Sequence, residues 1–353
     1  MIRILTMTFF ILLLSVISSK GQTDFRVMSY NVENLFDTED NPLTADEEFL
    51  PSGNRHWTGG RFYHKLQQVA KVITAAGEWS TPALVGLCEV ENDSVLVRLL
   101  RQTPLRQQHY RYCMTHGEDT RGINVALLYQ RDKFRYLGHA EQPVRFTRKQ
   151  HKHTRNILHV WGEVLTGDRL DVFVCHFPSR YGGEKESEPD RFDAARTLRS
   201  LCDSVYALRP APHILIMGDF NDTPDDISIR QILDAHPFPI RWASVPDSMR
   251  IESQTDRHPF LRLCNLFAER KTHPSGSHKY QGEWSQLDQI IISSALADTH
   301  LVPGSARIFS PPFLLTKDKT WRGERPFRSY YGFKYEGGYS DHLPIIADFL
   351  LSK

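Results

Sequence analysis

Apolar runs of two kinds follow one another along most of this chain. Short apolar runs bounded by turn residues are typical of buried strands, whereas apolar residues three and four positions apart are typical of helices. Strands are predicted over residues 25–28, 83–87, 123–129, 157–165, 170–175, 213–217, 289–292 and 343–349. Helices are predicted around residues 66–73, 95–100 and 187–208. Because the strands and helices mix without strict β-α-β alternation, the pattern favours a layered α/β sandwich over a parallel barrel.

The N-terminal segment differs from the rest of the chain. Arg3 precedes the apolar run Phe9–Ile17, and a small polar stretch follows that run. This order is typical of a secretory signal peptide, and the run is too short to span a bilayer comfortably; an amphipathic or buried N-terminal helix is the alternative. We predict a signal peptide over residues 1–21 and a single domain over 22–353, exported to the periplasm or secreted, with no transmembrane span in the mature chain.

Composition narrows the class of protein. The chain has 353 residues, of which 40% are hydrophobic and 24% charged, as expected of a soluble globular protein. A net charge of +1 argues against a protein that holds nucleic acid by bulk electrostatics, although a metal and a local basic patch can still hold one phosphate. The five cysteines are odd in number and lack close pairs, so they predict neither a disulfide framework nor a zinc site.

Polar side chains stand at the ends of the predicted strands. Four motifs share this position: Ser29–Glu33, Leu87–Glu89, Gly218–Asn221 and Ser340–His342. Carboxylates, carboxamides and an imidazole at strand ends are what a site needs to hold a hard divalent cation beside a water nucleophile. Because the motifs extend across nearly the whole mature chain, one site can collect them only if that chain forms one domain.

Each of these residues also has a purely structural interpretation. Asp219 and Asn221 are common turn and cap residues, but on an extended backbone they project to the same side and could serve water, metal or phosphate. Glu89 ends an apolar strand, where a carboxylate is costly unless it is paired or bound to a cation; a surface position is the alternative. Asn31, taken alone, is better explained as a turn residue.

Two further pairs of residues have side chains suited to proton transfer or to anion binding. Asp288 precedes the strand 289–292 and could orient the imidazole of His342 as a proton acceptor; an ordinary strand-entry Asp is the alternative. His176 ends the strand 170–175, and Arg180 follows it on a loop that ends in two glycines. A His and an Arg on one loop suit contact with an oxyanion or a phosphate, whereas a solvated loop is the structural alternative.

Together, these motifs resemble the endonuclease/exonuclease/phosphatase superfamily, in particular its exported bacterial members. The resemblance covers Phe25 to Phe349 and rests on Gly218–Asn221 with Ser340–His342, supported by the other residues above. It implies an α/β fold, a four-layer sandwich of two packed mixed β-sheets flanked by helices. It also implies that the domain 22–353 is catalytic and hydrolyses a phosphoester with Mg²⁺ or Mn²⁺.

The resemblance further implies roles for single residues. Glu89 would be the principal metal ligand, supported by Asn31, Asp341 and Glu33. His342, oriented by Asp288, would act as general base or stabilise the phosphoryl transition state, with Asp219 as the rival for positioning the attacking water. Asn221 and Arg180 would bind phosphate oxygens, and His176 would stabilise the phosphoryl group or help the leaving oxygen.

Three hypotheses for the substrate follow. An exported endonuclease or phosphodiesterase is favoured by the cations and aromatic rings between Arg322 and Tyr335, which suit nucleic acid but also suit a solvated loop. A sphingomyelinase-like phospholipid phosphodiesterase, or an inositol-phosphate or sugar-phosphate phosphatase, is the alternative; Pro312–Leu315 is a modest candidate for membrane docking. A catalytically silent binding protein has little support, because every expected polar position is filled. No obligate protein partner is indicated.

Overall fold

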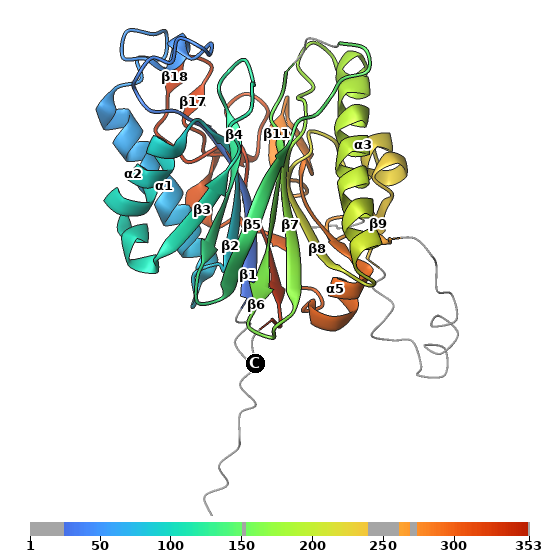
Figure 1. The fold of residues 1–353 in the computed structure, drawn as a ribbon. Helices are drawn as coiled ribbons and strands as arrows, with labels where there is room; N and C mark the ends of the chain where they lie inside the picture. The colour runs from blue at the N-terminus through green and yellow to red at the C-terminus, as the bar shows by residue number, and fades with distance from the viewer. Residues whose placement is uncertain (1–24, 150–152, 239–260, 269–273, 352–353) are drawn as a thin grey trace, which may run out of the picture.

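The chain forms two large β-sheets that pack face to face, with helices on both outer faces (Figure 1). The computed structural model describes residues 25–149, 153–238, 261–268 and 274–351. The four layers confirm the predicted sandwich. The segment 1–21, predicted as a signal peptide, lies outside the described residues, so that expectation stays a prediction. Among the described helices, none combines the length and the apolar character that a bilayer crossing requires.

The first sheet is mixed and has six strands in the order β14-β19-β1-β2-β4-β3. Its strands are β1 (Phe25–Leu35), β2 (Leu84–Val90), β3 (Tyr110–Met114), β4 (Asn124–Gln130), β14 (Arg307–Ile308) and β19 (Ile345–Phe349). The central strand β1 pairs in parallel with β2 and antiparallel with β19. Segments from the beginning and the end of the domain therefore lie side by side.

The second sheet is also mixed and has seven strands in the order β5-β6-β7-β8-β13-β10-β9. Its strands are β5 (Phe134–Gln142), β6 (Ile157–Val164), β7 (Arg169–His176), β8 (His213–Asp219), β9 (Ala235–Pro237), β10 (Leu263–Asn265) and β13 (Asp288–Ser293). Strand β8 pairs in parallel with β7 and antiparallel with β13. The ends of these three strands carry His176, Asp219 and Asp288.

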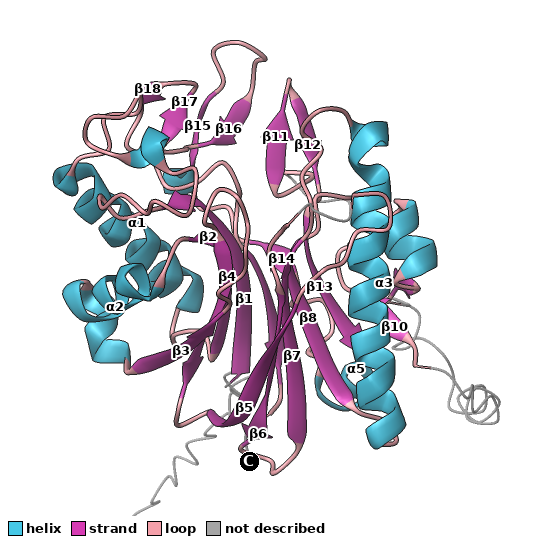
Figure 2. Ribbon diagram, turned by 45° about the horizontal axis from the view of Figure 1, so that its top comes forward, coloured by secondary structure: helices cyan, strands magenta, loops and turns pink. Residues whose placement is uncertain are grey.

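Helices cover the outer faces, and short hairpins stand at one end of the sheets (Figure 2). The α-helices are α1 (Gly59–Gly77), α2 (Asp93–Gln102), α3 (Glu184–Leu208) and α5 (Ser294–His300), and shorter turns are η1 (Glu47–Phe49), η2 (Pro104–Gln108), η3 (Ser228–Ile232) and η5 (Pro312–Leu314). The hairpins are β11 (His278–Tyr280) with β12 (Glu283–Ser285), β15 (Leu315–Lys317) with β16 (Glu324–Pro326), and β17 (Tyr330–Tyr331) with β18 (Lys334–Tyr335).

The alternation of side chains along the strands produces the layers. In β8, Leu215 and Met217 enter the core between the two sheets, whereas Ile214 and Ile216 enter the core under α3. Successive residues of a strand point to opposite faces, so an uninterrupted apolar run is what a strand buried on both faces requires. Burying each such side chain contributes roughly 1.5–3 kcal/mol. The apolar run that predicted β8 is therefore also the reason for its central position.

Three details differ from the sequence-based expectations. Strand β1 continues well past residue 28 to Leu35. Lys65 belongs to a residue type that is mostly exposed, yet it is only 2% exposed and donates to the hydroxyl of Ser329 at 2.6 Å. Leu314, in the segment considered for membrane docking, is also only 2% exposed. That segment therefore packs into the protein as η5 and the start of β15.

Candidate active site

The side chains expected to carry chemistry meet at one end of the two sheets. In the second sheet, His176 is in register with Asp219, and Asp219 with Asp288, so that the three residues form one row. In the first sheet, Asn31 lies beside the residue that precedes Glu89. The carboxamide Nδ2 of Asn31 donates to Oδ2 of Asp219 at 3.0 Å and joins the two sheets. We call Asn31, Glu89, His176, Asp219, Asp288 and His342 the strand-end cluster.

Gly218 permits the close approach of β8 to β7 beside the cluster. Its φ is +147°, and a Cβ at this position would lie 1.9 Å from the carbonyl oxygen of Cys175. Only glycine fits such a backbone and such a contact. The glycine of the Gly218–Asn221 motif therefore sets where the carboxylate of Asp219 leaves the sheet.

Asp219 lies at the centre of the cluster. Its Oδ1 accepts the backbone N–H of Asn221 at 2.9 Å, while its Oδ2 accepts from Asn31. The same Oδ2 lies 3.6 Å from Nε2 of His176 and 3.8 Å from Nε2 of His342. This carboxylate is thus fixed by two hydrogen bonds and faces two imidazoles.

His342 and Asp288 form a buried hydrogen-bonded pair. Nδ1 of His342 lies 2.7 Å from Oδ2 of Asp288, which also accepts the hydroxyl of Ser277 at 2.6 Å. On the other side, the hydroxyl of Ser340 accepts the backbone N–H of His342 at 3.0 Å and donates to the carbonyl of Asn31 at 2.7 Å. The imidazole is therefore held from its ring and from its backbone, with Nε2 directed at Asp219.

Burial and neighbouring charge separate the two imidazoles electrostatically. Burial disfavours the imidazolium of His342, but the carboxylates of Asp288 and Asp219 outweigh it and hold the pKa of His342 well above its usual range. Burial and the nearby cation Arg155 hold the pKa of His176 well below its usual range. Burial, together with the charge of Asp288, raises the pKa of Asp219 although His342 opposes this. Burial and charge therefore push the pKa values of the two imidazoles in opposite directions.

Glu89 approaches His176 from the first sheet. Its Oε1 lies 3.9 Å from Nε2 of His176, and its Oε2 accepts the backbone N–H of Asn34 at 2.8 Å. Glu89 has a φ of +67°, and Asn34 one of +53°. Left-handed backbone at residues other than glycine costs about 1–3 kcal/mol each and is frequent at functional sites. The strand end that presents Glu89 therefore has a conformation that the backbone alone does not favour and that the surrounding structure must hold.

Glu33 and Asp341 are paired with cations of the protein. Arg328 places Nη2 2.8 Å from Oδ2 of Asp341 and Nε 3.4 Å from Oε1 of Glu33. Lys65 lies 3.8 Å from Oε2 of Glu33, which also accepts the backbone N–H of Ser329 at 2.7 Å. Despite its burial, Asp341 has a lowered pKa because Arg328 and other cations face it. Because Arg328 and Lys65 both contact Glu33, its carboxylate is better suited to hold these two cations near Asp341 than to bind a metal ion directly.

Arg180 and Asn221 lie beside the cluster, but their donors are already engaged. Arg180 donates from Nε to the carbonyl of Asn221 at 2.7 Å and pairs with Asp222 and Asp226. The Nδ2 of Asn221 donates to the carbonyl of Phe177 at 3.0 Å. The structure therefore places Arg180 where it orients the Asn221 turn. The predicted phosphate contacts of both residues remain predictions.

A pocket opens beside Asp341 at the same end of the molecule. The hairpin residues that line it include Lys279, Tyr280, Trp321, Arg325, Arg328 and Tyr331. The guanidinium of Arg325 lies over the ring of Tyr331, 4.8 Å from its centroid. Trp321 and Tyr280 are 50% and 68% exposed. Exposed aromatic faces and cations thus stand next to the strand-end cluster.

Comparison with known proteins identifies the family. A family model described as the Endonuclease/Exonuclease/phosphatase family matches residues 26–350, almost the whole described chain. The chain belongs to this family. It is therefore a metal-dependent hydrolase of phosphoric esters, as endonuclease/exonuclease/phosphatase enzymes are. No protein with a curated function matches the sequence.

Solved structures of this family share the fold. The human nocturnin catalytic domain with bound sulfate has a TM-score of 0.51 at 15% identity, over 92% of this chain and 93% of that one. A mannosyl-6-phosphatase from Bacteroides thetaiotaomicron has a TM-score of 0.52 at 15% identity, over 92% and 99%. TDP2 from D. rerio with a single-strand DNA product has a TM-score of 0.52 at 14% identity, over 92% and 98%.

The donor set fits the divalent cation on which the family depends. Burial lowers the pKa of Lys65, and the carboxylates of Glu33, Asp341 and Glu89 oppose this, so all three lie near its ammonium. Carboxylates that share a site repel one another unless a cation neutralises them. Carboxylate and carboxamide oxygens are the ligands that hard cations prefer. Glu89, Asn31 and Asp341 are suited to hold such an ion.

Three residues of the site went unrecognised in the sequence. Ser277 fixes Asp288, and its neighbour His278 packs its ring 4.6 Å from that of His342. Lys65 contacts Glu33 from α1. A serine in a loop carries no pattern, and a lysine on a helix reads as exposed. His278 lies far along the chain from His342, so no local spacing indicates that the two rings meet.

Proposed function

We propose that the protein is an exported phosphodiesterase that cleaves nucleic acid with Mg²⁺ or Mn²⁺. The observation that carries the nucleic-acid substrate is the pocket beside Asp341. There, the exposed ring of Trp321 and the cation Arg325 stand next to the strand-end cluster. Aromatic faces stack nucleobases, so a base finds a partner at Trp321, whereas Arg325 is paired with Glu336 and would exchange that partner for a phosphate when a strand binds.

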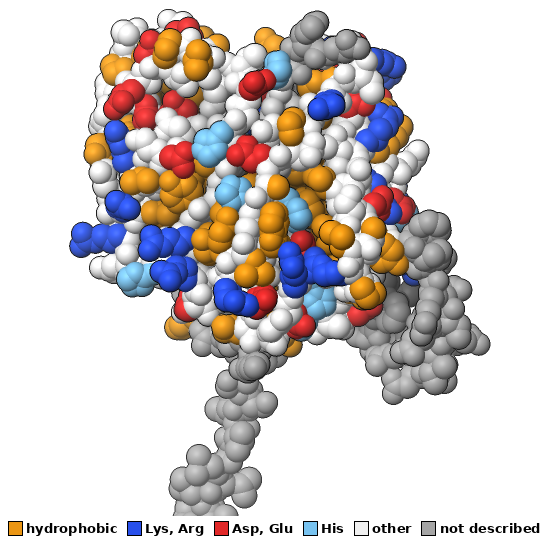
Figure 3. Space-filling model, in the orientation of Figure 1, with side chains coloured by type: hydrophobic (Ala, Val, Ile, Leu, Met, Phe, Trp, Pro, Cys, Tyr) orange, Lys and Arg blue, Asp and Glu red, His pale blue; other side chains and the backbone are white. Residues whose placement is uncertain are grey.

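The charge distribution suits a substrate held by a few local contacts better than one attracted to the whole surface. On the face shown in Figure 3, acidic and basic side chains of the described residues are interspersed, in line with the net charge of +1. A substrate would therefore be held by contacts at the hairpins and the cluster. Because the protein would contact only a few phosphates, its affinity should fall only modestly as the salt concentration rises.

The metal would be held by Glu89, Asn31 and Asp341. Bound there, a divalent ion neutralises charge on the phosphoryl group and favours an ionised water. The protein's own residues supply the rest of the chemistry. Arg328, paired with Asp341, keeps that carboxylate ionised and in place.

Asp219 is the residue that we assign to the attacking water. Its carboxylate is fixed by Asn31 and by the N–H of Asn221, and its raised pKa makes it a better proton acceptor than a free Asp. The proton of the water would move to Oδ2. His342 is then left to donate from Nε2 to a phosphoryl oxygen, with Asp288 compensating the imidazolium charge.

His176 acts in this proposal as a neutral hydrogen-bond donor. Its Nδ1 has no hydrogen-bond partner among the described residues, and its Nε2 faces Asp219 and Glu89. A proton on Nε2 suits these two acceptors, and it can turn to a phosphoryl oxygen when a substrate enters. Arg180 would support the same region by holding the turn that carries Asn221.

The two alternative substrate classes are less well supported. For phospholipids, the docking candidate Pro312–Leu315 packs Leu314 into the core and keeps Phe313 and Leu315 partly buried, so it offers little apolar surface. A soluble sugar phosphate would also find an aromatic face at Trp321, and release of its phosphate is therefore the competing outcome. Export is proposed from the N-terminal pattern alone, and N-terminal sequencing of the protein recovered from the producing cells tests it: cleavage near residue 21 is expected.

The deciding experiment is a substrate panel on the purified mature protein. We expect cleavage of single-stranded or duplex DNA or of RNA with Mg²⁺ or Mn²⁺, and loss of cleavage with chelator. Glu89→Gln is the inactive control. Inactivity on all nucleic acids, with phosphate released from sugar or inositol phosphates, would overturn the nuclease proposal and leave the phosphoesterase assignment intact.

A further inference from the structure

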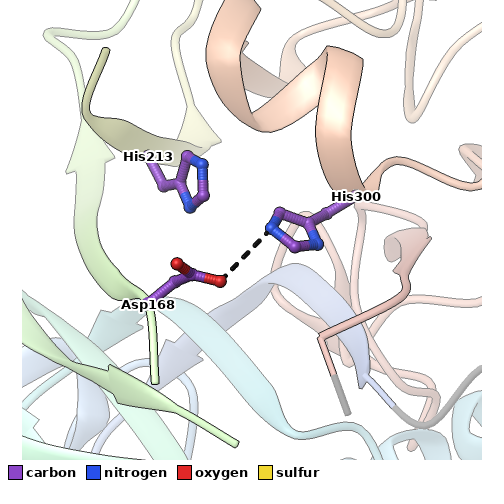
Figure 4. Close-up of side chains that lie close together, drawn as sticks. All are labelled: Asp168, His213 and His300. Atoms are coloured by element: carbon purple, nitrogen blue, oxygen red, sulfur yellow. Dashed lines mark ion pairs between the residues drawn. The ribbon is translucent and has the colours of Figure 1, made fainter. Parts of the chain in front are cut away.

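Two imidazoles and a carboxylate converge at the end of the second sheet opposite the active site (Figure 4). Asp168 lies in the turn between β6 and β7, His213 is the first residue of β8, and His300 is the last residue of α5. Strand β8 runs from His213 to Asp219, which separates the two sites by about 20 Å. These three side chains therefore take no part in the chemistry of the strand-end cluster.

The spacing of the three side chains suits one small ion. One possible ligand atom from each lies within 4.8 Å of the others, and Nε2 of His300 lies 3.5 Å from Oδ2 of Asp168. The rings of His213 and His300 are nearly perpendicular, with centroids 5.0 Å apart. Ligand atoms bound to a tetrahedral ion at about 2.0–2.1 Å are about 3.3 Å from one another. The His300–Asp168 distance is already close to this value.

The hydrogen bonds of His300 leave the correct nitrogen free. Its Nδ1 lies 2.8 Å from the carbonyl oxygen of Leu350, which can only accept, so Nδ1 carries a proton. The lone pair of Nε2 then faces the carboxylate of Asp168, where two electron-rich atoms repel each other unless a proton or a metal ion lies between them. A ring nitrogen held by a backbone carbonyl is the usual support of a metal-binding histidine.

His213 and Asp168 are positioned in a similar way. Nε2 of His213 lies 3.5 Å from the hydroxyl of Thr299, which donates its own proton to the carbonyl of Ala295 at 2.7 Å. The Thr299 oxygen therefore accepts from Nε2, and Nδ1 of His213 is free for a ligand. Thr166 orients Asp168 by donating to Oδ2 at 2.6 Å.

We propose that Asp168, His213 and His300 bind a divalent transition-metal ion of the zinc class, at a second site separate from the catalytic one. Imidazole nitrogens select Zn²⁺, Co²⁺ or Ni²⁺ over Mg²⁺, whereas the oxygen ligands near Glu89 select the harder ion. The side chain of Asp168 is 45% exposed, so water can complete the coordination.

Such an ion would connect four parts of the chain. Asp168 belongs to the β6–β7 turn, His213 to β8 and His300 to α5, and His300 also contacts Leu350 after β19. Through the contact between His300 and Leu350, the ion would link the chain after β19 of the first sheet to the second sheet, at the end opposite the active site. The proposed role is structural, so its consequence is a rise in thermal stability with Zn²⁺.

The test is titration of the whole mature protein with Zn²⁺, in the presence of excess Mg²⁺ so that oxygen-ligand sites are filled. We expect one equivalent of Zn²⁺ to bind and to raise the melting temperature, and Co²⁺ to give the visible absorption of a tetrahedral ion. In His300→Ala and in His213→Ala, Zn²⁺ affinity should fall at least tenfold and the absorption should be lost.

His116→Ala is the matched control. His116 also lies between two carboxylates, but both of its ring nitrogens are engaged, with Asp93 at 2.8 Å and Glu141 at 3.2 Å. Its removal should leave Zn²⁺ binding unchanged. If a histidine variant does not fold, Asp168→Asn replaces it, with the same expected loss. Equal Zn²⁺ affinity in wild type and all variants would overturn the proposal and leave a plain His–Asp ion pair; the nuclease assay is independent of this result.

Discussion

Asn31 and Asp219 stand 188 residues apart on different sheets, and the carboxamide of the first donates to the carboxylate of the second at 3.0 Å. This hydrogen bond holds the proposed water-binding carboxylate against a proposed metal ligand. It also fixes which oxygen of Asp219 faces His176 and His342. The catalytic geometry therefore depends on how the two sheets pack, in addition to the identity of the residues.

Asp219→Asn should remove catalysis without unfolding the protein. The amide oxygen can still accept hydrogen bonds, but the side chain can no longer take a proton from water. We expect the turnover number to fall about 10²–10⁴-fold, the usual contribution of a positioned proton acceptor, with little change in melting temperature. Steady-state kinetics and a thermal melt check this, and a variant with wild-type turnover would transfer the role to His342.

Asp288→Asn should impair His342 through its orientation and charge. The buried carboxylate holds Nδ1 of His342 at 2.7 Å, and an amide can present either a donor or an acceptor there. We expect the turnover number to fall by about 10²-fold or more while KM changes little. Ser277→Ala, which removes one hydrogen bond to Asp288, should show a smaller effect of the same kind. A loss confined to KM would contradict a role in turnover.

Trp321→Ala should weaken substrate binding and spare the chemical step. Stacking of a base on an aromatic ring is worth about 1–3 kcal/mol, so KM for a nucleic-acid substrate should rise about 5- to 160-fold with turnover nearly unchanged. Trp79→Ala is the control, because Trp79 is 90% exposed and is not among the residues lining the pocket. Equal KM values for the two variants would show that the pocket does not hold the substrate.

Glu91 should make the stability depend on pH. Burial raises the pKa of Glu91 from 4.5 to about 8, so the folded protein keeps a proton that the unfolded chain releases near pH 4.5. The stability from this group is therefore complete below pH 4.5 and is lost as the pH rises through 8. In this window the loss is at most about 1.4 kcal/mol per pH unit.

Glu91→Gln removes the titration and keeps an acceptor for the backbone N–H of Asp37, which Glu91 binds at 2.7 Å. Urea unfolding with chelator, from about pH 5 to about pH 9, should show the variant gaining stability relative to wild type as the pH rises. A constant difference across this range would mean that Glu91 is ionised in the folded protein at neutral pH.

The strand ends could be predicted from the sequence because apolar runs reveal both where strands stop and which residues follow. This is why Glu89, His176 and Asp219 were found from their positions alone. Their convergence across two sheets, however, was implied by family resemblance, because periodicity carries no information about which strands pair. Only the fold shows the neighbouring charges, such as Arg155 near His176, that shift the pKa values of the site residues.

Burial is the property that local pattern described least well. Lys65 occupies a polar position of an amphipathic helix, yet the loop that contributes Ser329 covers it. Arg180 follows His176 closely and was expected to bind phosphate, but Asp222 and Asp226 engage its guanidinium. In both cases the deciding neighbour is distant in the sequence, so no local pattern could reveal it.

The pairing of β1 with both β2 and β19 has a consequence for when the enzyme becomes active. Asn31 enters the site near the start of the domain, whereas His342 enters just before its last strand. A nascent polypeptide therefore lacks a complete site until its last strand has formed, however well its earlier part has folded. For the proposed nuclease, this late completion would delay activity until the whole domain has been synthesised.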